Sequence, residues 1–162
     1  MVIVLMGVSG TGKTTVGRLL AEALGGEFAE GDAYHPPANV EKMRQGIPLD
    51  DADRQPWLER LAREIGAWLA AGRTVVLACS ALKHSYRKIL RGDRADVFFV
   101  HLKGDPALIR ARLAGRRGHY MPPSLLDSQL ATLEEPKSAL VVGIEGQPEE
   151  IVAQIVTALP RA

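Results

Sequence analysis

The sequence predicts an α/β protein in three layers, with a five-stranded parallel sheet, helices on both faces and a small lid. Short runs of consecutive apolar residues, typical of strands buried on both faces, alternate with segments of helical periodicity. The first run, residues 2–6, leads directly into Gly7-Val-Ser-Gly-Thr-Gly-Lys-Thr14. This loop fits the phosphate-binding pattern G-x-x-x-x-G-K-[ST], which requires a strand before it and a helix after it. Alternating strands and helices favour parallel pairing through right-handed crossovers.

The predicted elements follow in order along the chain. Helical periodicity from residue 12 ends near residue 24, where Gly25-Gly26 stops the helix, and residues 27–30 form a short second strand. Residues 33–56 are polar and punctuated by prolines, with one short helix at about 37–44, so we expect a substrate-facing segment. The later elements are a helix over 57–71, a strand over 74–79, a helix reaching about 90, a strand over 96–102, helices over 105–113 and 124–134, a strand over 140–144 and a helix over 147–159.

Length and composition limit the class of protein. With 162 residues, 46% of them hydrophobic and 24% charged, the chain predicts one ordered domain over 1–162. A net charge of +1 favours neither a nucleic-acid nor a membrane partner. The apolar start is too short for a signal peptide, and Cys79 has no second cysteine, so a reducing cytoplasm is expected. We expect Cys79 to be a small buried residue, and Trp57 and Trp68 to be core anchors.

The phosphate loop, residues 7–14, predicts nucleotide binding. Its glycines let the backbone turn tightly and direct successive N–H groups at phosphate oxygens. Lys13 is expected to reach the β- and γ-phosphates of ATP, and the Thr14 hydroxyl to be a ligand of Mg²⁺. ATP and Mg²⁺ are thus the expected cofactors. The predicted nucleotide-binding residues are Gly7, Val8, Ser9, Gly10, Thr11, Gly12, Lys13, Thr14 and Thr15.

Two acidic residues near the end of the second strand suggest which phosphate chemistry follows. No Asn-Lys-x-Asp guanine-reading motif is present, and the 74–79 strand ends without the acidic residue of a mechanical ATPase. Asp32 follows a strand predicted beside the phosphate loop, where its carboxylate could orient an attacking hydroxyl and accept its proton. The alternative is that Asp32 only caps a turn. We interpret Glu30 as a neighbour of Mg²⁺ through water.

Basic side chains gather in the segments after the second and third strands. Taken singly, each is a solvated surface charge; together they predict a site for a polyhydroxylated anion. The candidate substrate ligands are Asp32, His35, Lys42, Arg54, Lys83 and Arg87.

A further basic cluster contains Arg112, Arg116, Arg117 and His119. Flanking glycines and prolines suggest a lid over about 112–123, in which Arg116 stabilises the charge of the transition state. An exposed basic helix end is the alternative.

Three long stretches resemble the signature segments of bacterial gluconokinases. They are GDAYHPPANVEKMRQGIPLDDADRQPWL, CSALKHSYRKILR and HYMPPSLLDSQLATLEEP, which with the phosphate loop span residues 7–136. The resemblance implies phosphorylation of D-gluconate at its 6-hydroxyl by ATP, a P-loop kinase fold similar to adenylate and shikimate kinases, and a homodimer. It also implies that Lys13 and Asp32 are catalytic and that Thr14 is a ligand of the metal. Residues 112–117 resemble the start of the lid in nucleoside monophosphate kinases, which implies that Arg112 stacks on adenine and that a later arginine, Arg116, contacts phosphate as a catalytic residue. In related kinases an aspartate is common at the position of Glu30.

Two alternatives stay open at this point. Another small-molecule kinase of the same fold, such as a shikimate kinase, would also need a site for an anionic substrate. A nucleotide-binding regulator without turnover would keep the phosphate loop, although the complete set of Lys13, Thr14, Asp32 and the arginine cluster argues against it.

Overall fold

A five-stranded parallel sheet forms the centre of the molecule, as the sequence predicts. The structure is a computed structural model that describes residues 1–115 and 123–161. The strands lie in the order β2-β3-β1-β4-β5 and all neighbours pair in parallel. Their bounds are β1 Val2–Met6, β2 Glu27–Glu30, β3 Val75–Ala78, β4 Val97–Lys103 and β5 Leu140–Gly143.

The central strand β1 is fully buried because both of its edges are paired and both of its faces are covered. Val4 pairs with Leu77 of β3 on one side and with Phe99 of β4 on the other. All five residues of β1 have 0% exposure. The continuous apolar run therefore predicted the most buried strand correctly. The strand β2 is not adjacent to β1, because β3 lies between them. Its carboxyl end nevertheless lies beside the phosphate loop, as the sequence predicted, since the Thr14 hydroxyl donates to Glu30 at 2.7 Å.

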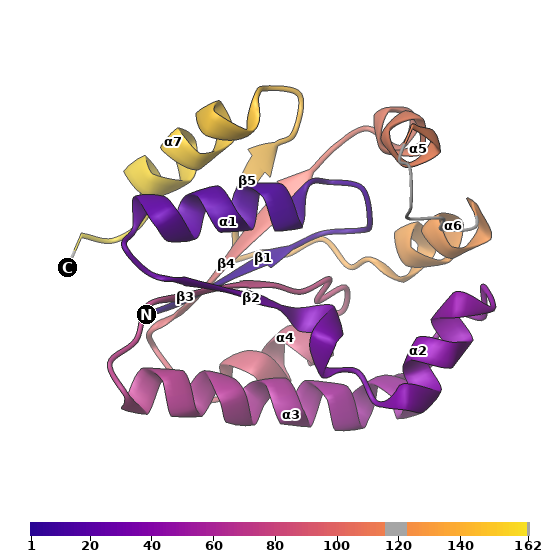
Figure 1. Cartoon of the computed structure of the whole chain (residues 1–162), viewed down its shortest axis with the longest axis horizontal. Helices are drawn as coiled ribbons and strands as arrows, with labels where there is room; N and C mark the ends of the chain where they lie inside the picture. The colour runs from indigo at the N-terminus through magenta and orange to yellow at the C-terminus, as the bar shows by residue number, and fades with distance from the viewer. Residues whose placement is uncertain (116–122, 162) are drawn as a thin grey trace.

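Helices cover both faces of the sheet (Figure 1). On one face lie α1 (Lys13–Ala23) and α7 (Pro148–Ala158), and on the other α3 (Asp51–Ala70) and α4 (His84–Arg91). Trp57 and Trp68 belong to the hydrophobic core that joins α3 to the sheet, with exposures of 1% and 5%, which confirms that they are core anchors. None of the helices in the described residues is long and apolar enough to cross a membrane.

Three further helices lie at the end of the molecule where the phosphate loop connects β1 to α1 (Figure 1). They are α2 (Pro37–Arg44), α5 (Pro106–Ala114) and α6 (Pro123–Thr132). A short 3₁₀ turn, η1 (Gly31–Tyr34), joins β2 to the segment that contains α2. Ligands bind at the carboxyl ends of the strands in sheets of this kind, so these elements surround the expected site.

The helix α3 begins six residues earlier than the sequence predicted, at Asp51 instead of Trp57. The helix continues through Pro56, although a proline inside a helix removes a backbone hydrogen bond. A capping box compensates: the Asp50 carboxylate accepts from the Asp53 N–H at 2.7 Å, and the Asp53 carboxylate accepts from the Asp50 N–H at 3.0 Å. The consequence is that Arg54 lies on a helix rather than in a loop.

Candidate active site

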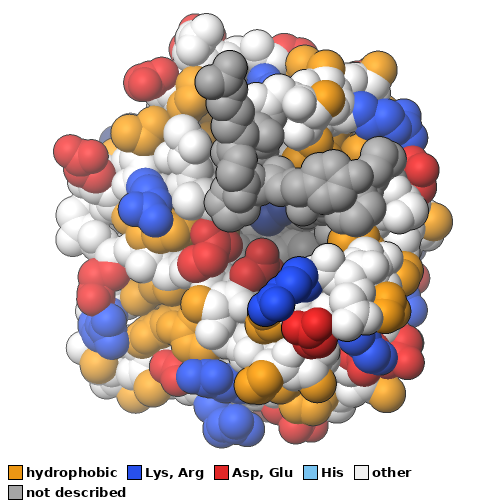
Figure 2. All heavy atoms as spheres, turned by 45° about the vertical axis from the view of Figure 1, so that its right-hand side comes forward, with side chains coloured by type: hydrophobic (Ala, Val, Ile, Leu, Met, Phe, Trp, Pro, Cys, Tyr) orange, Lys and Arg blue, Asp and Glu red, His pale blue; other side chains and the backbone are white. Residues whose placement is uncertain are grey.

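A cleft of about 470 Å³ opens beside the carboxyl ends of the strands. The phosphate loop, η1, α2, the start of α3 and α6 all contribute to its walls. Figure 2 shows this end of the molecule, where acidic and basic side chains lie close together near a central hollow. The predicted site residues that line the cleft are Ser9, Lys13, Glu30, Asp32, His35 and Arg54.

The phosphate loop has the backbone geometry that its glycines allow. Gly7, Gly10 and Gly12 have φ angles of +148°, +87° and +91°, in the region that residues with a side chain rarely adopt. A Cβ atom at Gly7 would also lie 2.8 Å from the carbonyl oxygen of Leu102. The Lys13 ammonium curls back over the loop and donates to the carbonyls of Gly7 and Val8, both at 2.9 Å. The loop therefore holds the Lys13 ammonium close to the place where a bound phosphate group would lie.

Thr14 and Glu30 form the part of the site that suits a magnesium ion. The Thr14 hydroxyl donates to the Glu30 carboxylate at 2.7 Å. This hydrogen bond points the Thr14 proton away and leaves the oxygen lone pairs available to a cation. The described residues contain no group of three or more His, Cys, Asp or Glu side chains able to hold a metal. A site with few protein ligands, completed by phosphate oxygens and water, is what Mg²⁺ prefers, so the residues fit.

The Asp32 carboxylate projects from η1 into the cleft, with 71% of its side chain exposed. Within the described parts of the chain it makes no hydrogen bond, so it does not cap the turn. Its nearest charged neighbour is His35, whose Nε2 lies 3.8 Å from the Asp32 Oδ1. An exposed and unengaged carboxylate at a strand end is able to accept a hydrogen bond from a substrate hydroxyl.

The His35 ring is fixed behind Asp32 by two neighbours. The Asn39 side-chain amide donates to His35 Nδ1 at 3.1 Å and to the Asp53 carbonyl at 2.8 Å. Since the carbonyl only accepts, this assigns the Asn39 nitrogen as the donor and places the proton of neutral His35 on Nε2, toward Asp32. Trp57 stacks on the imidazole, with ring centroids 4.1 Å apart. Burial lowers the pKa of His35, so the ring is neutral at pH 7.

Three predicted substrate ligands do not line the cleft. Lys42 donates to the Asp53 carboxylate at 2.8 and 3.0 Å, and Lys83 donates to the Asp51 carboxylate at 3.0 and 3.2 Å. Arg87 is only 7% exposed and donates to the carbonyls of three residues, Ala81, Leu82 and Glu134, at 2.7 to 3.1 Å. Lys42 joins α2 to α3, Lys83 joins the start of α4 to α3, and Arg87 joins α4 to the segment after α6.

Two residues that the sequence did not single out also line the cleft, Gln129 and Arg44. The Gln129 amide oxygen accepts from the Ser9 N–H at 2.8 Å, and its nitrogen donates to the Ser9 hydroxyl at 3.2 Å. Arg44 is largely exposed and pairs with Glu41 at 3.7 Å. A glutamine in mid-helix and an arginine at a helix end are ordinary surface residues by sequence, so no local pattern distinguishes them.

Of the predicted lid over about 112–123, the structure describes residues 112–115 and 123. The Arg112 guanidinium donates to the Ile144 carbonyl at 2.7 Å, which ties α5 to the residue after β5. The other members of the cluster, Arg116, Arg117 and His119, lie outside the described residues. The catalytic role expected of Arg116 and most of the lid over 112–123 therefore stay predictions.

Cys79 borders the cleft but is not a nucleophile. The side chain is 1% exposed, and burial raises the pKa of its thiol to about 12. The expectation of a small buried residue is confirmed.

Sequence comparisons identify relatives along almost the whole chain. A protein family described as an AAA domain matches residues 2–136. A gluconokinase of Gluconobacter oxydans is 51% identical over 157 residues, which cover 95% of this chain and 88% of the relative. The thermoresistant gluconokinase of Escherichia coli is 40% identical, and the match covers 99% of this chain and 94% of the relative.

Solved structures agree with these relatives. A gluconokinase from Sinorhizobium meliloti superposes with a TM-score of 0.86 at 46% identity, covering 96% of this chain and 89% of that structure. The shikimate kinase of Aquifex aeolicus superposes with a TM-score of 0.63 at 19% identity, covering 98% and 95% of the two chains. At that identity the second match shows only that the fold is shared.

Proposed function

This chain belongs to the gluconokinase family, and we propose that it phosphorylates D-gluconate at the 6-hydroxyl with ATP as the phosphoryl donor. One observation carries the proposal beyond family membership: a single cleft joins the phosphate loop with Lys13 to the unengaged Asp32 carboxylate. Phosphoryl transfer needs a positive charge at the transferring group and an acceptor that is oriented in line with it. The two sides of the cleft supply these two requirements.

The phosphate loop forms the nucleotide half of the proposed site. The backbone N–H groups between Gly10 and Thr15 bind the phosphate oxygens, because those of Gly7 and Ser9 already donate to Ser80 and Gln129. Lys13 moves from the loop carbonyls to the β- and γ-phosphates. We assign Arg112 to the adenine ring, on which the resemblance implies that it stacks. We assign Arg116 to the charge that develops on the transferring group, as the family resemblance implies.

Thr14 and Glu30 form the proposed magnesium site. The Thr14 oxygen would be a direct ligand, and Glu30 orients the hydroxyl by accepting its hydrogen bond. When bound there, Mg²⁺ would neutralise part of the charge on the phosphates of ATP.

Replacing Thr14 with valine is expected to raise the Mg²⁺ concentration needed for half-maximal activity by roughly 10- to 100-fold, because the isosteric side chain cannot ligate the ion. A magnesium titration at fixed ATP would measure the change. Thr14→Ser keeps the hydroxyl and should stay within about threefold of the wild type. An unchanged magnesium dependence in Thr14→Val would exclude Thr14 as a ligand.

The gluconate half of the proposed site consists of Asp32, His35 and Arg54. Asp32 orients the 6-hydroxyl and accepts its proton as the bond to phosphorus forms. The Nε2 of neutral His35 faces Asp32 at 3.8 Å and is placed to donate its proton in a hydrogen bond to a neighbouring substrate hydroxyl. Arg54 provides the cation that a substrate carboxylate needs. A homodimer and a cytoplasmic location stay predictions.

A coupled assay of ADP release across several acceptors would test the proposed function. We expect kcat/KM for D-gluconate to exceed that for shikimate and for nucleoside monophosphates by at least about 10²-fold, because differences in buried polar contacts discriminate between substrates at this level. Turnover of shikimate without turnover of gluconate would contradict the proposal. ATP binding without transfer to any acceptor would instead favour the nucleotide-binding regulator.

A further inference from the structure

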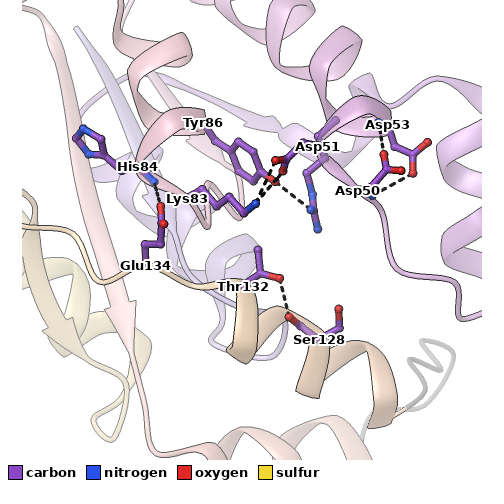
Figure 3. A network of polar contacts seen from close by, with 10 residues as sticks. Asp50, Asp51, Asp53, Lys83, His84, Tyr86, Ser128, Thr132 and Glu134 are labelled. Carbon is purple, nitrogen blue, oxygen red and sulfur yellow. Dashed lines mark hydrogen bonds and ion pairs between the residues drawn. The ribbon is translucent and has the colours of Figure 1, made fainter.

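A chain of polar contacts connects the cleft to the start of α3 through one buried tyrosine, Tyr86. Figure 3 shows Tyr86 and Lys83 reaching from the start of α4 toward Asp51. The Arg54 guanidinium donates to the Tyr86 hydroxyl at 3.1 Å, and that hydroxyl donates to the Asp51 carboxylate. Lys83 donates to the same carboxylate at 3.0 Å. Of these four residues only Arg54 lines the cleft.

The chemistry of the four side chains determines which group donates in each of these hydrogen bonds. A guanidinium only donates, and an ionised carboxylate only accepts. The Tyr86 hydroxyl must therefore accept from Arg54 and donate to Asp51, which leaves it no alternative orientation. The hydrogen bond from Tyr86, together with Lys83, lowers the pKa of Asp51, whereas burial and Asp51 raise the pKa of Tyr86. Both groups hold these protonation states throughout the neutral pH range.

The Tyr86 ring also contacts the cation that it orients. Tyr86 is 3% exposed, and the central carbon of the Arg54 guanidinium lies 5.4 Å from the centroid of its ring. A cation at this distance from an aromatic face is attracted to it. The ring and the hydroxyl together restrict both the position and the tilt of the guanidinium.

The arrangement holds Arg54 through a hydroxyl group and an aromatic ring, and not through a direct ion pair. Asp51 is already paired with Lys83, and in the described parts of the chain Arg54 forms no salt bridge of its own. Its charge is felt inside the cleft, because it contributes to the lowered pKa of His35. A guanidinium has five N–H donors, and Tyr86 uses one of them. Among residues 1–115 and 123–161 no other hydrogen bond of this side chain is found, so its remaining donors can bind an anion in the cleft.

We propose that Tyr86 and Asp51 are positioning residues that hold the Arg54 guanidinium in place to receive the carboxylate of the sugar acid. The inference rests on the proposed function and adds two residues to it. A preorganised cation lowers the cost of binding, because the side chain is already ordered before the substrate arrives. Neither residue needs to touch the substrate.

The variant Tyr86→Phe tests this role, since it removes the hydroxyl and keeps the ring in the core. We expect KM for gluconate to rise about 10-fold, KM for ATP to stay within about twofold, and kcat to change little, because the lost contact serves substrate binding. Tyr34→Phe is the matched control: an arginine, Arg60, lies 5.0 Å from the Tyr34 ring, but neither residue lines the cleft. The control should retain both KM values.

A double-mutant cycle separates positioning from a general structural effect. If Tyr86 acts through Arg54, adding Tyr86→Phe to Arg54→Ala should change kcat/KM for gluconate less than about twofold. Asp51→Asn provides a second variant whose side chain is 67% exposed, so it should fold even if Tyr86→Phe does not. It should raise KM for gluconate without changing KM for ATP.

Two results would overturn the proposal: a wild-type KM for gluconate in both Tyr86→Phe and Asp51→Asn, or a Tyr86→Phe effect of full size in the Arg54→Ala background. Either result leaves the wild-type enzyme turning over gluconate. Failure of the proposed function itself would be different, because the wild type would then not phosphorylate gluconate at all.

Discussion

Replacing Lys13 with alanine is expected to lower kcat by about 10³-fold and to weaken ATP binding. Lys13 is the one basic residue of the phosphate-loop motif, residues 7–14. Removing a preorganised charge that stabilises a transferring group lowers the rate by about two to three orders of magnitude. In this structure the ammonium already lies over the loop, within 2.9 Å of two loop carbonyls. Steady-state kinetics with gluconate and calorimetric titration with ATP would measure both effects.

The Lys13→Ala experiment needs a control for folding and for charge. Lys137→Ala removes an exposed lysine that does not line the cleft, and it should retain wild-type kinetics. Circular dichroism would show whether Lys13→Ala keeps the helical content of the wild type. If a folded Lys13→Ala retained more than about a tenth of the wild-type kcat, the loop would not be the site of transfer.

Replacing Asp32 with asparagine is expected to lower kcat by roughly 10²- to 10³-fold and to leave the affinity for ATP nearly unchanged. The amide has the size of the carboxylate but cannot accept a proton, and general base catalysis contributes about this factor. We expect the two effects to be separate, because Asp32 lies on η1, whereas the residues of the phosphate site lie on the loop after β1 and on the first turn of α1. Measuring kcat together with the dissociation constant of ATP would show whether turnover falls while ATP binding is kept.

Asp93→Asn is a suitable control for Asp32→Asn, since Asp93 is an exposed residue that does not line the cleft. Turnover of Asp32→Asn at the wild-type rate would rule out the base. A raised KM for gluconate at unchanged kcat would show that Asp32 binds the substrate without accepting its proton.

Local patterns predicted the sheet and the phosphate loop well. The run Val2–Met6 and the glycines of the loop are determined by neighbouring residues, and both are found where the sequence placed them. The start of α3 depended instead on a capping box and on ion pairs from Lys42 and Lys83, which outweigh the effect of Pro56. Because Lys42 and Lys83 lie in segments separate from the start of α3, no local sequence pattern predicts their ion pairs with it.

The same limit explains which site residues the sequence identified. Asp32 follows a strand end, and strand ends meet at one edge of a parallel sheet, so its place in the cleft was predictable even though β3 separates β2 from β1. The sequence could not predict the direction in which each basic side chain points. Lys42, Lys83 and Arg87 bind acidic or carbonyl groups of the fold, whereas Gln129 reaches Ser9 across 120 residues of sequence.

The central claim is that the cleft directs the γ-phosphoryl group of ATP to the 6-hydroxyl of gluconate. A phosphorus–proton correlation spectrum of the product tests it most directly. We predict one new phosphate ester whose phosphorus couples to the two protons of a terminal methylene group. Coupling to a single proton, which would place the phosphate on a secondary hydroxyl, or release of inorganic phosphate alone would contradict the claim.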